Sequence, residues 1–196
     1  MTNSARWVLL SGLFVASGLL PTPAQNDPPT IYVVEGACPY EGCKYGEWRA
    51  EKPVIVREQQ DTSSNVVCVL HKGDGVLALG GVVMTRPGVA RVLRNKDDFK
   101  EGERFLIYTY EGEGVVKIWY QGQMSEIDTL TLCNAQCING IECYRWMEDP
   151  PDCWAIVEKH PESSWWVRVK GANGAEGWCL NDYAFCEVHG YDACPP

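Results

Sequence analysis

The chain has 196 residues and a formal net charge of −9, from 17 Lys plus Arg against 26 Asp plus Glu. A chain this acidic repels phosphate backbones, so nucleic acid is not expected as a partner. Its ten cysteines and 45% hydrophobic content indicate a folded protein that works where disulfides form.

The first element in chain order has the pattern of a secretory signal peptide over residues 1–24. Arg6 precedes an apolar run at residues 7–20, and a small-residue exit ends at Ala24. The run is shorter than the roughly 20 residues that a membrane-spanning helix needs. We therefore expect cleavage near Ala24 and a secreted or periplasmic protein with no membrane span after cleavage.

A Pro- and Cys-containing segment at residues 25–49 leads into a series of short β-type runs. Branched and aromatic residues between Gly, Asn and Asp turns are typical of strands. Such runs occur at residues 53–57, 66–70, 76–79, 82–84, 89–93, 105–110 and 115–120. No helix-period window is longer than about two turns. These patterns predict an all-β fold, with a β lobe over residues 50–128.

Residues 129–196 form a Cys-rich segment of different composition. Asp149-Pro150-Pro151-Asp152 interrupts any regular element. Strand signal returns at residues 165–170, and a Gly/Asn-rich loop leads to Trp178-Cys179-Leu180. The segment therefore ends in a predicted hairpin.

The cysteines predict disulfides rather than a metal site. They contain no Cys-x-x-Cys pair, and no histidine lies at zinc-finger spacing from them. We expect five disulfides and no free thiol, with the connectivity left open, and neither a metal nor a cofactor. The ten residues are Cys38, Cys43, Cys68, Cys133, Cys137, Cys143, Cys153, Cys179, Cys186 and Cys194.

Two pieces of the chain resemble the two halves of a bacterial Src-homology-3-like (SH3-like) domain. Residues 54–79 match its opening half, with a strand, a Ser-rich loop, a second strand, the Lys72-Gly73-Asp74 turn and a third strand. Residues 165–178 match its closing half, which ends in Gly177-Trp178. The resemblance implies a small five-stranded barrel that is completed by the closing hairpin.

The long separation between the two pieces leaves two arrangements open. One barrel can carry a long Cys-rich insertion at its middle loop, or residues 50–128 can form one barrel and the C-terminal pieces a second lobe. A weak repeat between residues 70–79 and 99–108, each with a turn glycine before a strand, favours two related lobes.

No catalytic motif is present in the sequence. The chain lacks a Gly-x-Ser-x-Gly elbow and a His-Glu-x-x-His helix, and its carboxylates do not follow a calcium-loop pattern. We therefore expect no catalytic residues and a protein that is not an enzyme.

Aromatic residues are the strongest functional indication, since the chain has eight Trp and nine Tyr. Period-two alternation directs Trp165 into the core and Trp166 outward, and it sets Trp119 opposite Ile118. Exposed aromatics beside Lys and Arg are typical of peptide or sugar grooves, and the cations suit a carboxylate-bearing peptide. The predicted ligand-binding residues are Tyr108, Tyr110, Trp119, Trp166 and Arg168.

These patterns favour a non-enzymatic exported binding or scaffold module. The SH3-like resemblance implies a peptide, peptidoglycan or envelope-protein partner. The alternatives are a secreted hydrolase or hydrolase inhibitor with a site built from loops, and a purely structural envelope protein.

Overall fold

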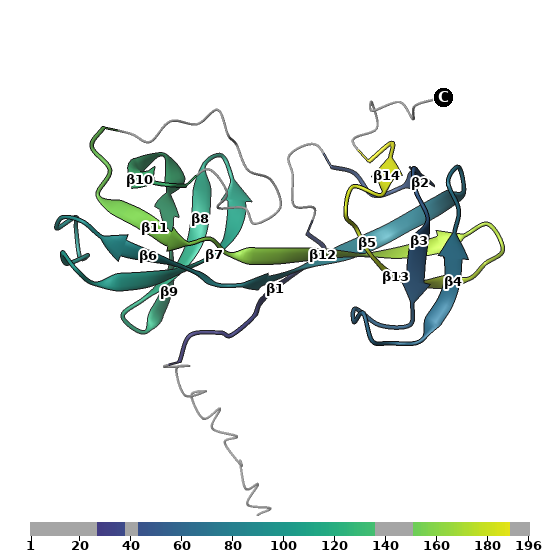
Figure 1. The fold of residues 1–196 in the computed structure, drawn as a ribbon, viewed down its shortest axis with the longest axis horizontal. Helices are drawn as coiled ribbons and strands as arrows, with labels where there is room; N and C mark the ends of the chain where they lie inside the picture. The colour runs from purple at the N-terminus through teal and green to yellow at the C-terminus, as the bar shows by residue number, and fades with distance from the viewer. Residues whose placement is uncertain (1–26, 38–42, 136–150, 189–196) are drawn as a thin grey trace, which may run out of the picture.

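The computed structural model describes residues 27–37, 43–135 and 151–188. Within these ranges the chain is built from β-strands and one 3₁₀ turn, so the all-β prediction is confirmed. The strands form two curled sheets, which lie side by side in Figure 1 and are joined by the long strands β5 and β12.

The first sheet collects strands from both ends of the chain, in the order β14-β2-β5-β12-β13-β3-β4, with β1 also paired to β5. Its strands are β1 (Tyr32–Glu35), β2 (Glu47–Ala50), β3 (Val54–Arg57), β4 (Val66–Leu70), β5 (Gly75–Arg86), β12 (Glu162–Gly171), β13 (Glu176–Leu180) and β14 (Phe185–Cys186). The second sheet has the order β10-β11-β6-β7-β8-β9. Its strands are β6 (Gly88–Val92), β7 (Arg104–Gly112), β8 (Val115–Tyr120), β9 (Gln123–Asp128), β10 (Leu132–Cys133) and β11 (Ala155–Lys159), and the 3₁₀ turn η1 covers Thr129–Thr131.

The first sheet curls around a hydrophobic core. Along its strands buried side chains alternate with exposed ones. Val54 and Val56 of β3 are buried while Ile55 between them is exposed. Trp165 on β12 is 1% exposed and packs edge-on against Trp48, with ring centroids 5.8 Å apart. Its indole donates a hydrogen bond to the Tyr45 hydroxyl oxygen at 3.3 Å.

The second sheet has a core of its own with an aromatic cluster at one end. Phe99 stacks on Tyr120 with ring centroids 4.4 Å apart, and Trp154 stacks on Phe105 at 5.6 Å. The Trp154 indole donates a hydrogen bond to Thr131 Oγ1 at 2.8 Å. Each sheet therefore encloses a separate hydrophobic core.

The chain crosses between the sheets at two adjacent points. It leaves the first sheet after Arg86 and returns to it at Glu162. Gly88 lies at this junction, where a Cβ atom would come within 2.3 Å of the Lys159 carbonyl oxygen and 2.6 Å of the Pro161 nitrogen. Only glycine allows the two crossing segments to approach so closely.

The strand order of the two sheets divides the chain differently from the segments predicted from the sequence. The two pieces that resemble an SH3-like domain lie in one sheet, where β13 pairs with β3 and β12 pairs with β5. The predicted lobe of residues 50–128 is divided, because β3–β5 belong to the first sheet and β6–β9 to the second. The predicted signal peptide at residues 1–24 lies outside the described residues.

The cysteines differ in part from the expected complete pairing. Cys133 and Cys153 form a disulfide, and Cys43 and Cys186 each take part in a further disulfide. The prediction is wrong for Cys68 and Cys179, which are free thiols. Both point toward the core of the first sheet, on strands that β3 separates. The other four, at positions 38, 137, 143 and 194, lie outside the described residues.

The described residues contain no helix long and apolar enough to cross a membrane.

Candidate functional site

Tyr108 is a predicted ligand-binding residue that the structure buries completely, so the prediction that its ring is exposed is wrong. Its ring lies 5.5 Å from that of Tyr32, and its hydroxyl donates a hydrogen bond to the Pro29 carbonyl at 2.8 Å. The N-terminal segment therefore covers Tyr108, and the burial raises the pKa of its phenol to about 12.

This buried phenol predicts a loss of stability at alkaline pH. An unfolded chain ionises the tyrosine near its ordinary pKa of 10.0, whereas the folded chain keeps it neutral up to about 12. The contribution is fully present below pH 10 and is lost as pH rises toward 12. Relative to a Tyr108→Phe variant, denaturant unfolding of the wild type should lose about 2–3 kcal/mol over this range. Parallel pH profiles of the two proteins would contradict this.

Trp119 and Tyr110 are half-buried residues of the second sheet. Ile118 is fully buried, so Trp119 faces outward as alternation predicts, in a cross-strand row with Leu106 and Met124. Tyr110 packs against the core of this sheet, and its hydroxyl accepts a hydrogen bond from the Gly114 backbone at 2.8 Å. These two side chains are not brought together with Trp166, which belongs to the other sheet.

Two of the cations expected to attract a carboxylate already have acidic partners. Arg168 is ion-paired with Glu176 on the neighbouring strand. Lys117 is ion-paired with Glu126 directly opposite it, and this hydrogen bond raises the pKa of Lys117. Their charges are therefore largely neutralised by the protein itself.

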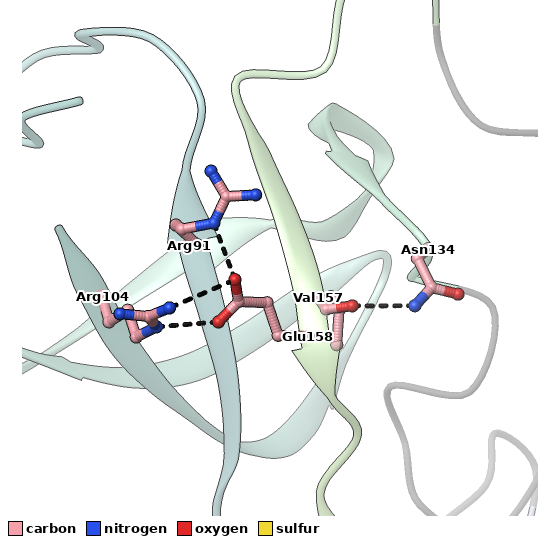
Figure 2. Close-up of polar contacts among 5 residues, drawn as sticks. All are labelled: Arg91, Arg104, Asn134, Val157 and Glu158. Carbon is pink, nitrogen blue, oxygen red and sulfur yellow. Dashed lines mark hydrogen bonds and ion pairs between the residues drawn. The ribbon is translucent and has the colours of Figure 1, made fainter. Parts of the chain in front are cut away.

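A third polar cluster, on β6, β7 and β11, is likewise satisfied internally (Figure 2). The Glu158 carboxylate accepts hydrogen bonds from Arg91 Nε at 2.7 Å and Arg104 Nε at 2.8 Å. These bonds, chiefly those from Arg104, lower the pKa of Glu158. The neighbouring Val157 carbonyl accepts a bond from Asn134 at 2.7 Å. The cluster ties three strands together and leaves little charge for a ligand.

Trp166 is only 5% exposed, so the expectation of an exposed ring is wrong here too, but the residue lines a pocket of about 360 Å³. It lies on the opposite face of β12 from Trp165, as alternation predicts, and directly across from Leu180 on β13. The pocket is lined by Ile31, Gln60, Asp61, Thr62, Met84, Arg86, Glu162, Ser163, Ser164, Trp166 and Leu180. Trp166 is the only predicted site residue among them.

The loop between β3 and β4 forms one wall of this pocket and is held by local hydrogen bonds. The Asp61 carboxylate accepts bonds from the Ser63 backbone and hydroxyl, both at 2.8 Å, which lower the pKa of Asp61. Arg57 donates to the Ser64 carbonyl at 2.6 Å. The bond from the Ser63 backbone to Asp61 is that of an Asx turn, and together these bonds hold the loop in one conformation.

Arg86 is the cation of the pocket, and sequence reasoning missed it. It lies opposite Glu162 in the β5–β12 register, but Glu162 pairs instead with Lys159 at 3.6 Å. Among the described residues no ion pair involves Arg86. A guanidinium without a carboxylate partner at the rim of a pocket is suited to bind an anionic group.

Trp178 is a second residue that was missed, although its position could have been predicted. Gly177 and Cys179 are buried on either side of it, so alternation turns Trp178 to the outer face. There the half-buried ring lies between Arg57 and Arg168 in the cross-strand register.

The described residues contain no group of three or more His, Cys, Asp or Glu that could hold a metal ion.

Comparisons with protein-family models, with curated proteins and with solved structures give no match to this chain.

Proposed function

We propose that the protein is a non-enzymatic, exported binding module and that the Trp166 pocket holds an extended peptide. The observation that carries the proposal is a pocket in which an apolar surface, hydroxyl groups and an arginine converge, and this arginine forms no ion pair with the part of the chain that the structure describes. The resemblance of two pieces of the chain to an SH3-like domain supports a cell-wall peptide or an envelope protein as the partner.

The lining of the pocket defines the chemistry of the ligand. Trp166 and Leu180 offer an apolar surface for one side chain of the peptide. Arg86 can receive a carboxylate through a charge-assisted hydrogen bond. Asp61 and Glu162 add negative charge beside it, which favours a ligand that also bears an amine. A short peptide with both groups and a small apolar side chain fits this arrangement.

The free thiols of Cys68 and Cys179 do not supply a nucleophile for the alternative of a secreted hydrolase. Burial, followed by the nearby Cys68, raises the pKa of Cys179 to about 12. A catalytic cysteine needs a lowered pKa, because the thiolate is the nucleophile. Cys68 also points toward the core of the first sheet. We therefore favour binding over catalysis.

Replacing Arg86 with glutamine should weaken the binding of a soluble peptidoglycan stem peptide by about tenfold, the value of one charge-assisted hydrogen bond. Isothermal titration calorimetry measures this directly. The matched control is Arg168→Gln, on the same sheet but paired with Glu176 and outside the pocket, which should leave affinity unchanged. Equal effects of the two substitutions, or no binding of the stem peptide by the wild type, would refute the proposal.

A further inference from the structure

Strand β4 forms one edge of the first sheet, and its exposed side chains are apolar. It pairs with β3 only and ends the strand order of the sheet. Val66 is 53% exposed, Val67 38% and Val69 46%, and Ile55 opposite Val69 on β3 is 48% exposed. A β-bulge between β3 and β4 turns Val66 and Val67 outward in succession.

Within β4 this edge lacks two of the devices that protect isolated edge strands, charged side chains and proline. Proteins blunt an open edge with charged side chains or proline, because its unpaired backbone groups accept another strand. β4 contains neither, although the chain as a whole has a net charge of −9. An uncharged, valine-rich edge in so acidic a protein is suited to pairing with another strand.

Two exposed residues of opposite charge, Glu58 and Lys72, flank β4. Glu58 lies at the start, where its carboxylate accepts a hydrogen bond from Asn65 at 3.0 Å. At the other end His71 is ion-paired with Asp74 of the following turn, and Lys72 is the exposed cation. Glu58 and Lys72 are both exposed, and neither forms an ion pair with the described residues. An antiparallel second copy would bring Lys72 of one chain towards Glu58 of the other.

We propose that two copies of this chain associate through antiparallel pairing of their β4 strands, with the two-fold axis at the central residue, Cys68. In this register Val67 faces Val69 of the other copy, and His71 faces its Asn65. Lys72 then lies near Glu58 of the other copy, and by symmetry the contact occurs twice. The pairing extends the first sheet across the dimer and covers its exposed valines.

Sedimentation equilibrium of the full chain over a range of concentrations tests the edge. The wild type should dimerise, and Val69→Lys should weaken dimerisation by about tenfold or more, because it places a charge in the strand pair. Leu79→Lys is the matched control, since Leu79 is 43% exposed on β5 within the same sheet; it should have no effect. A wild type that stays monomeric, or equal effects of both substitutions, would overturn the proposal.

A charge exchange at two exposed positions tests the register. Glu58→Lys and Lys72→Glu should each weaken the dimer by about threefold, as expected for exposed ion pairs. The double variant restores both symmetric contacts and should dimerise like the wild type. If the two substitutions instead add their losses, the antiparallel pairing through β4 is incorrect.

Discussion

Replacing Trp165 with alanine is expected to lower the free energy of unfolding by about 3–5 kcal/mol, the usual cost of emptying a buried aromatic site. Trp165 is 1% exposed and contacts Trp48 and Tyr45 within the core of the first sheet. The variant also removes the donor to the Tyr45 hydroxyl, which itself donates to the Ala37 carbonyl at 2.6 Å. Denaturant unfolding followed by circular dichroism measures the loss.

Trp166→Ala provides the comparison within the same dipeptide. Trp166 lies outside both core clusters and against a pocket that is open to solvent. Water can enter the space that its ring leaves, so the cavity penalty should be smaller and the loss about 1–2 kcal/mol. A larger loss for Trp166→Ala than for Trp165→Ala would contradict the assignment of Trp165 to the core.

Removing the Cys133–Cys153 disulfide is expected to destabilise the second sheet by about 3 kcal/mol, the entropic value of a bridge that closes a loop of this length. The two cysteines are 20 residues apart. The bridge joins β10 to the segment that holds Trp154 against Phe99 and Phe105. The double variant Cys133→Ser/Cys153→Ser should therefore unfold at a lower denaturant concentration than the wild type.

Cys68→Ser is the control for this change, because Cys68 is a free thiol on the other sheet. It removes a cysteine without opening a loop, so it should leave the unfolding of the second sheet unaltered. Equal midpoints for the disulfide variant and the wild type would show that the bridge does not constrain the unfolded chain.

The sequence by itself predicted β3, β4, β6, β7, β8 and the β12–β13 hairpin, with the direction of their side chains. It divided β5 into two runs and predicted no strand at β1, β2, β9, β10, β11 or β14. Branched and aromatic residues that alternate with polar ones cannot bury one stripe as a helix, so the all-β class followed from local pattern alone. The same alternation correctly set Trp165 opposite Trp166 and Ile118 opposite Trp119. It would also have found Trp178, between the buried Gly177 and Cys179.

Only the tertiary structure decided what covers each face and which strands share a sheet. Alternation gives a direction, but the N-terminal segment that buries Tyr108 and the close packing around Trp166 arise from residues distant in sequence. The ion pairs that neutralise Lys117 and Arg168 depend on the pairing of consecutive strands, and the free thiols of Cys68 and Cys179 on their separation within the sheet. Strand pairing between residues 54–86 and 162–180 joins segments that are far apart in sequence, which no local pattern encodes.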